Sequence, residues 1–393
     1  MFLRIKYSVQ LLYRQIKQKK KIQTFLDYSI LKRKNYHVFF GYYDISPFNP
    51  QSDELICVKK SDREDYVHIC LSKIGKEEFT EIASSSAWNW QQGIRLRWMP
   101  SNDRSIIFND YIDSKYISRV INIDSREEKK YLFPLYDISP NGLLGLTLNF
   151  ERLGVMRPGY GYTCRKYVPN VASLSQEGIE LVDLVTNTSK KILTYSEISK
   201  TLGERDNTFE NNYINHISFS PSGHKFLFFW LTITERFHEA YLLVYNLHDK
   251  KLVILEDEKR VSHYDWIDDD NILCTALEQD ESCGYFIYNT SNRTRTPVLP
   301  NVLSGDGHPT YLGNGIFITD TYPDRMGFQK ILKVDINKES KNELLSIYSD
   351  CRLTGERRTD LHPRVSVPRE MISIDSSPSK YREMIFLKGV KFD

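Results

Sequence analysis

A pattern that recurs seven times constrains the fold of this chain most strongly. Each copy has a polar or aromatic start, a strand of alternating apolar residues, a turn and a second apolar strand. The copies start at Tyr42, Arg95, Leu135, His216, His263, His308 and His362. The starts are 53, 40, 81, 47, 45 and 54 residues apart, and a blade of four strands needs about 40–50 residues. The sequence therefore predicts an all-β, seven-bladed β-propeller over residues 36–393 and disfavours an irregular β-sandwich assembly.

The turns and the composition agree with this fold. Ser-Pro-x-Gly sequences at 139–142 and 220–223 suit hairpins, because Pro presets φ and Gly accepts a positive φ. Aromatic residues make up 13% of the chain, a bias that favours strands. The single long step of 81 residues predicts an insertion spanning about 151–205, between the third and fourth repeats.

The N-terminal segment differs from the rest of the chain. Residues 1–35 contain ten Lys or Arg and one Asp, whereas the remaining 358 residues sum to −7. Apolar residues recur at helical spacing from Phe2 to Ile16, which predicts a basic amphipathic helix within 1–35. Such a helix can contact an anionic membrane surface through residues 1–22, or it can pack on the main domain. The acidic remainder argues against a nucleic-acid partner.

Three absences in the sequence define the expected compartment. The sequence contains no run of 18 apolar residues, so no membrane-spanning helix is expected. The N-terminus is a poor signal peptide. The six cysteines show no CxxC spacing, so a zinc ribbon is not expected. Reduced thiols in a cytoplasmic protein, peripheral at the inner membrane surface if the helix binds there, are the prediction.

Histidine occupies the same position in four of the seven repeats. His216, His263, His308 and His362 each begin a segment, and in a propeller that position faces one end of the central channel. Four converging imidazoles indicate a metal or an acid–base site. The alternative is that each one is a hydrogen-bonded core residue or holds a turn before proline, as His308 and His362 do.

Four motifs resemble those of the oligogalacturonate lyase-like propellers, in the wider TolB-like group. They are NHISFSPSG, SHYDW, GDGHPTY and DLHPRVS, and the resemblance covers roughly residues 40–380. It implies a manganese ion held by histidines and a glutamine at the channel mouth, and cleavage of uronate-containing oligosaccharides by β-elimination. By motif, His216, His308 and His362 are the implied ligands, and Gln92 or its neighbour Gln91 supplies an oxygen. His263 is implied as a ligand or catalytic base.

β-Elimination next to a carboxylate also needs cationic and aromatic groups that bind the anionic sugar. The expected catalytic residues are His263, Arg95 and Arg157. The expected substrate-binding residues are Arg97, Arg152, Arg165, Tyr160, Tyr162 and Trp90. Trp88 and Trp90 are a sugar platform or, as strand neighbours, core residues. Asp306 and Asp360 each precede a histidine by two residues and can orient an imidazole or close an Asx turn, whereas Asp320 and Asp324 receive no role.

The function that the sequence favours is metal-assisted β-elimination on an acidic glycan, in surface polysaccharide metabolism. Two alternatives stay open. One is a non-catalytic propeller that binds a glycan or a protein, because a fold alone does not define a function. The other is a glycoside hydrolase or glycosyltransferase-like role in capsule biosynthesis, although no convincing carboxylate pair for hydrolysis is present.

Overall fold

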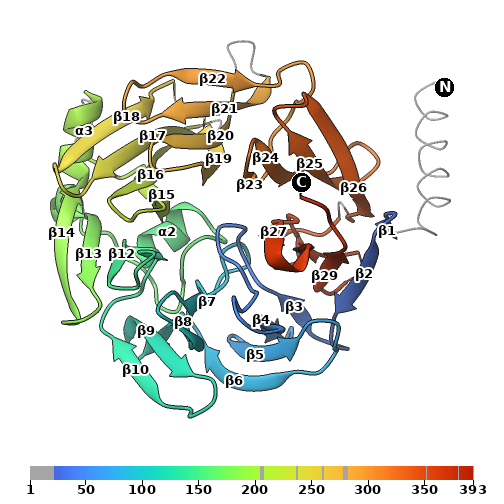
Figure 1. Cartoon of the computed structure of the whole chain (residues 1–393). Helices are drawn as coiled ribbons and strands as arrows, with labels where there is room; N and C mark the ends of the chain where they lie inside the picture. The colour runs from blue at the N-terminus through green and yellow to red at the C-terminus, as the bar shows by residue number, and fades with distance from the viewer. Residues whose placement is uncertain are drawn as a thin grey trace, which may run out of the picture.

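The computed structural model shows seven antiparallel sheets arranged in a ring around a central axis (Figure 1). It describes residues 22–203, 208–235, 238–258, 261–277, 282–350, 352–378 and 380–392. The predicted seven-bladed propeller is confirmed. Apart from β1 and β2, which are added at the outer edges of the last two blades, the strands of each blade run in chain order from the centre of the ring outward.

The strands of the first four blades follow the repeat pattern. Blade one contains β3 (His37–Phe39), β4 (Glu54–Lys60), β5 (Val67–Lys73) and β6 (Thr80–Ser85). Blade two contains β7 (Arg97–Met99), β8 (Asn102–Ile112), β9 (Lys115–Asn122) and β10 (Glu128–Tyr131). Blade three contains β11 (Asp137–Ile138), β12 (Leu144–Thr147), β13 (Gly178–Asp183) and β14 (Thr188–Thr194). Blade four contains β15 (Asn212–Phe219), β16 (Lys225–Ile233), β17 (His238–Asn246) and β18 (Lys251–Glu256).

The last three blades complete the ring. Blade five contains β19 (Val261–Trp266), β20 (Asn271–Leu277), β21 (Cys283–Asn289) and β22 (Arg295–Val298). Blade six contains β23 (Thr310–Gly313), β24 (Ile316–Asp320), β25 (Phe328–Asp335) and β26 (Ser340–Tyr348). Blade seven contains β27 (Arg364–Ser366), β28 (Met371–Ser376) and β29 (Glu383–Lys388).

An N-terminal strand closes the ring. β2 (Asp27–Leu31) pairs antiparallel with β29 and becomes the outer strand of blade seven. β1 (Ile22–Gln23) pairs with β26 and adds a fifth strand to blade six. The prediction of a helix over 1–35 is therefore wrong for its last part, because these strands cover sheet edges that would otherwise be open. Residues 1–21, where the amphipathic pattern falls, lie outside the described residues.

The segment 151–205, expected as an insertion, contains ordinary blade strands as well. β13 and β14 lie within it and form the outer half of blade three. The additional chain consists of α2 (Phe150–Met156) and the 3-10 helix η1 (Val171–Gln176) before β13, and of α3 (Tyr195–Leu202) after β14. A capping box between Thr194 and Glu197 starts α3, and Gly203 in the left-handed region ends it.

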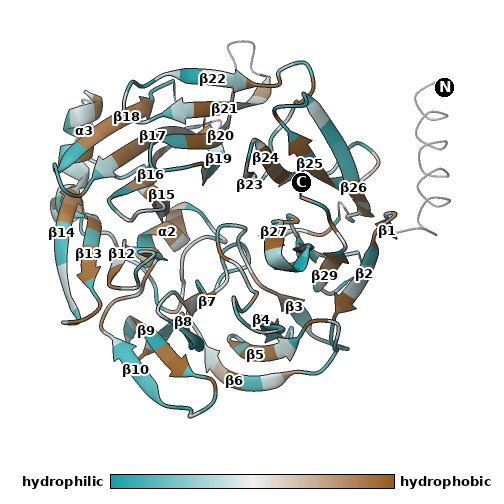
Figure 2. Ribbon diagram, in the orientation of Figure 1, coloured by the Kyte–Doolittle hydropathy of each residue, from teal (hydrophilic) through white to brown (hydrophobic). Residues whose placement is uncertain are grey.

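The core lies between neighbouring blades. Blade strands such as β16 and β17 are largely hydrophobic, whereas the outer strand β10 is hydrophilic (Figure 2). Phe226, Phe228 and Trp230 on β16 are all fully buried, in the largest apolar cluster. Within the described ranges, no helix is long and apolar enough to cross a membrane.

Candidate functional site

Four histidines from four consecutive blades meet at one end of the channel. The ring centroids of His263 and His308 lie 4.0 Å apart, and those of His308 and His362 lie 4.5 Å apart. His216 is 6.4 Å from His263. The ring of Tyr42 lies between 4.7 and 6.5 Å from all four. All four imidazoles are buried. The repeat register therefore places these side chains together, as the sequence indicated.

Irregular backbone points these side chains inward. His216 and His263 each lie where β15 and β19 shift register against the next strand, with one extra residue on the inner strand. His216 and His362 have φ of 55° and 49°, and Arg95, at the same repeat position, has φ of 54°. A positive φ is strained for residues with a side chain, and such strain concentrates at functional sites.

Three of the four rings are held through Nδ1. His308 Nδ1 lies 2.8 Å from Asp320 Oδ1, and His263 Nδ1 lies 2.9 Å from Asp306 Oδ1. His362 Nδ1 donates to the carbonyl oxygen of Gly41 at 2.9 Å. Each partner is an oxygen acceptor, so Nδ1 carries the proton and Nε2 of the neutral ring keeps a free lone pair. This arrangement is the one that orients histidine ligands at metal centres.

Buried polar atoms without partners occur in the cluster and beside it. Gln92 Oε1, Tyr42 Oη and His362 Nε2 are buried and have no hydrogen-bond partner among the described residues. The amide of Gln92 is fixed on its other side, because Nε2 donates to Tyr136 Oη at 2.6 Å. The amide oxygen of Gln92 and Nε2 of His362, which lack partners, are atoms of the types that bind a divalent transition-metal ion.

The pKa values of the histidines are shifted in different directions. Burial lowers the pKa of His216 and of His362 well below the usual value, so both rings are neutral at pH 7. Burial acts in the same direction on His308, but the charge of Asp320 outweighs it and raises the pKa of His308. The pKa of Asp306 is lowered although burial opposes this, because His263 stabilises the carboxylate.

A cavity of about 290 Å³ opens beside the cluster. Its lining includes His216, His263, Arg157, Tyr160 and Tyr322. The Arg157 guanidinium lies 5.4 Å from the ring centroid of Tyr160 and pairs with no carboxylate of the described residues. Arg157, expected as a catalytic residue, and Tyr160, expected as a substrate-binding residue, thus both line this cavity.

Two predicted arginines of blade two have other partners. Arg95 is 3% exposed, its Nη2 lies 2.8 Å from Asp44 Oδ2, and its Nε donates to the Tyr136 carbonyl. Arg97 pairs with Asp137 at 2.7 Å and lines a separate hollow without any of the four histidines. Their charges are already compensated by aspartates of neighbouring blades. The guanidinium groups of Arg95 and Arg97 therefore have structural ion pairs and are not free cations beside the histidines.

Three residues of the 151–165 segment lie away from the histidines. Arg152 is 2% exposed and donates to backbone carbonyls, including that of Asn212 at 2.9 Å. Arg165 is largely exposed and forms an ion pair with Glu151. Tyr162 is 1% exposed within the largest apolar cluster. None of these three lines the cavity next to the histidines.

The carboxylates near the cluster differ from the expected pair. Asp306 orients His263 rather than His308, and Asp360 bonds Gln91 Nε2 and Arg358 instead of His362. Asp320 was missed: it holds His308 Nδ1 and also accepts from the backbone N–H groups of His308 and His362. Its position at the end of β24 was the available signal, because β24 pairs antiparallel with the strand that follows His308 and so ends opposite that residue.

Two further expected site residues do not line the cavity beside the histidines. Gln91 and Trp90 follow Asn89 in the loop before β7, and Trp90 faces a second pocket.

In the ranges described, no three His, Cys, Asp or Glu side chains form a preassembled metal site. Binding a cation among the histidines and Gln92 thus requires the rings to adjust.

Comparisons with known proteins define the class. No protein-family model and no curated protein matches the chain. An oligogalacturonate lyase in complex with manganese has a TM-score of 0.68 at 12% identity, over 93% of this chain and 94% of that chain. An oligogalacturonate lyase from Vibrio parahaemolyticus has a TM-score of 0.66 at 10% identity, over 93% and 96%. The tricorn protease has a TM-score of 0.52 at 13% identity, over 89% of this chain and 34% of that chain. The chain is a seven-bladed propeller with the fold of the oligogalacturonate lyases.

Proposed function

We propose that this propeller is a divalent-cation-dependent enzyme that cleaves uronate-containing glycans by β-elimination at the channel mouth. The observation that carries the proposal is the set of buried ligand atoms there. His263, His308 and His362 each have Nδ1 fixed by an oxygen acceptor, and Gln92 Oε1 lacks a partner. In a purely structural core, a buried acceptor such as Gln92 Oε1 would have a hydrogen-bond partner.

The residues that would hold the cation are His263, His308, His362 and Gln92. Imidazole and amide oxygen together suit manganese and related ions, and the manganese complex of a lyase with this fold supports that choice. A bound divalent cation neutralises the substrate carboxylate and so makes the proton on the adjacent carbon easier to remove.

The substrate carboxylate and ring have binding groups beside this centre. Arg157 presents a guanidinium to the cavity, and a guanidinium can bind a carboxylate bidentately. The aromatic rings of Tyr160 and Tyr322 line the same cavity and can pack against a sugar ring. This side of the channel mouth is thus suited to an anionic sugar.

Elimination also needs a base and a proton donor. We assign the base to His216, because burial lowers its pKa and keeps it neutral, and its ring faces the cavity. It takes the proton from C5 of the uronate, the electron pair forms the C4–C5 double bond, and the C4–O bond breaks. Tyr160, whose pKa is raised by burial, keeps its phenol proton and gives it to the leaving oxygen.

The proposal is tested with purified protein, Mn²⁺ and a panel of uronate oligosaccharides. The ultraviolet absorbance of the unsaturated product and the metal content are both measured. His308→Ala is expected to lose both, whereas His248→Ala, whose side chain is 92% exposed on blade four, retains both. Absence of bound cation and of product with every substrate would contradict the proposal and favour a propeller that only binds a glycan or a protein.

A further inference from the structure

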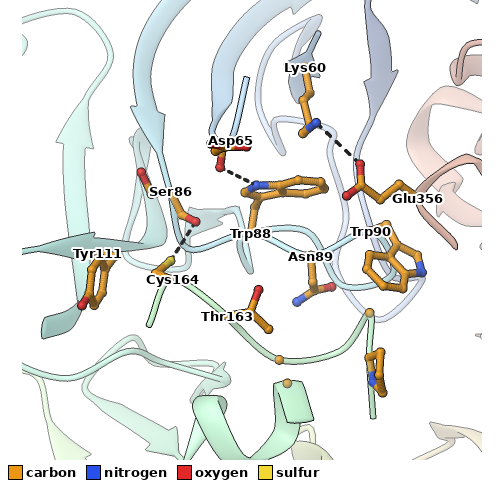
Figure 3. A pocket seen from close by; sticks show the side chains of 14 residues that line it. Lys60, Asp65, Ser86, Trp88, Asn89, Trp90, Tyr111, Thr163, Cys164 and Glu356 are labelled. Carbon is orange, nitrogen blue, oxygen red and sulfur yellow. Dashed lines mark hydrogen bonds and ion pairs between the residues drawn. The ribbon is translucent and has the colours of Figure 1, made fainter. Parts of the chain in front are cut away.

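A second pocket lies on the other side of the segment that carries Tyr160. It has a volume of about 560 Å³ and lies between the loop containing Trp88 and Trp90 and residues 158–164 (Figure 3). Gly159 and Gly161 line this pocket, whereas Tyr160 lines the cavity beside the histidines. The two hollows therefore share one wall. The volume falls within the range of about 300–1,000 Å³ typical of small-molecule sites.

An unsatisfied amide lies in this pocket. Asn89 is only 4% exposed, and its Oδ1 accepts from the backbone N–H groups of Gln91 and Gln92 at 3.2 and 2.6 Å. Its Nδ2 has no partner among the described residues. The nitrogen is turned toward Thr163 across the pocket (Figure 3). A buried donor without an acceptor is destabilising, and a ligand oxygen bound to it would remove that cost.

Two indole rings flank this amide, and both are held in place. Trp88 Nε1 donates to the Asp65 carbonyl at 2.8 Å, and the Lys60 ammonium lies 4.7 Å from the Trp88 ring centroid (Figure 3). The Trp90 ring packs on Gly159, where a Cβ would lie 2.7 Å from Cε2 and where φ is +98°. Fixed aromatic rings around a hydrogen-bonding amide suit a ring ligand that has apolar faces and hydroxyl edges.

The charges of the lining select among sugars. Lys60 Nζ lies 3.5 Å from Glu356 Oε2, so its charge is compensated, and Asp65 adds a further acidic residue. A uronate carboxylate would meet a net negative lining here. A neutral pyranose carries no charge and would not be repelled by this lining.

From these observations we infer that the Trp88–Trp90 pocket binds a neutral pyranose residue. The inference rests on the proposed function only in assigning that residue to the same glycan as the cleaved uronate. Asn89 connects the two sites, because the side chain that presents Nδ2 to the pocket also anchors the backbone of Gln92. The pocket is thus a subsite that positions an uncharged sugar next to the cleavage centre.

Tryptophan fluorescence tests this directly. Of the five tryptophans, Trp98, Trp230 and Trp266 are at most 8% exposed, so a soluble quencher such as acrylamide reaches mainly Trp88 and Trp90. Chelator-treated protein is titrated with cellotriose, maltotriose, chitotriose and trigalacturonate. At least one neutral trisaccharide is expected to reduce quenching, and trigalacturonate is not.

Variants separate this pocket from the histidine site. Asn89→Asp keeps a side-chain acceptor for the backbone N–H groups of Gln91 and Gln92 but loses the Nδ2 donor, and is expected to bind the neutral sugar about 10-fold or more weakly. Phe25→Ala removes an aromatic side chain that is 78% exposed elsewhere and should bind as wild type. Protection of the tryptophans by the neutral sugar must persist in His308→Ala. The inference can therefore hold even if the lyase proposal fails. Protection by none of the neutral probes, or only by trigalacturonate with Mn²⁺, would overturn the inference.

Discussion

Replacing Asp320 by Asn tests how the histidines are oriented. The Asp320 side chain is 2% exposed, and its carboxylate accepts three N–H groups: His308 N at 2.8 Å, His308 Nδ1 at 2.8 Å and His362 N at 3.0 Å. An asparagine offers one acceptor oxygen and turns an NH₂ group toward the remaining donor. At least one buried N–H then loses its acceptor, and the proton on His308 Nδ1 is no longer favoured.

The expected magnitudes follow from this geometry. Each buried N–H left without an acceptor costs about 1–3 kcal/mol of stability. Loss of the partner that orients a histidine ligand lowers metal affinity about 10–100-fold. Asp320→Asn is therefore expected to fold with a lower Tm and to bind Mn²⁺ at least about 10-fold more weakly.

Isothermal titration with Mn²⁺ and a thermal melt of the same samples measure both effects. The matched control is Asp324→Asn in the same blade, because among the described residues the Asp324 side chain accepts only from the backbone N–H groups of Met326 and Phe328, which an asparagine oxygen can also satisfy. A folded Asp320→Asn protein that binds Mn²⁺ as tightly as wild type would refute the reasoning.

Three further predictions concern stability and reactivity. Burial lowers the pKa of His37, so below about pH 6.5 the unfolded chain takes up a proton at this residue more readily than the folded chain does. The Tm should therefore fall as the pH drops from 7 to 5, and it should fall less in His37→Gln. Removing one member of the fully buried Arg364–Asp375 pair, 2.8 Å apart, should cost about 3–5 kcal/mol in Arg364→Leu, measured by denaturant unfolding. Burial raises the pKa of the Cys70 thiol to about 12, so iodoacetamide at pH 8 should modify the partly exposed Cys164 faster than the buried Cys70, and equal rates by mass spectrometry would contradict this packing.

The repeat pattern made the fold and the meeting of the histidines predictable. Strand alternation and turn residues are local signals, and the same register in successive blades converts them into a position around one axis. His216, His263, His308 and His362 could therefore be placed together although 146 residues separate the first from the last. Gln92 could be included because it precedes the second inner strand.

The partners of the charged residues could not be predicted in the same way. Arg95 and Arg97 look like free cations in the sequence, but Asp44 and Asp137 on neighbouring blades compensate them. Such pairs depend on which side chains face each other between blades, and no local pattern records this. The same holds for the edge of β29, which is covered by residues more than 350 positions earlier in the chain.

Anomalous scattering from a crystal soaked in Mn²⁺ tests the central claim most directly, because it locates the ion rather than only counting it. One strong peak is expected among His263, His308, His362 and Gln92, and it is lost in His308→Ala. A peak elsewhere, or none at these side chains in a well-ordered crystal, would contradict the assignment of the channel mouth as a cation site.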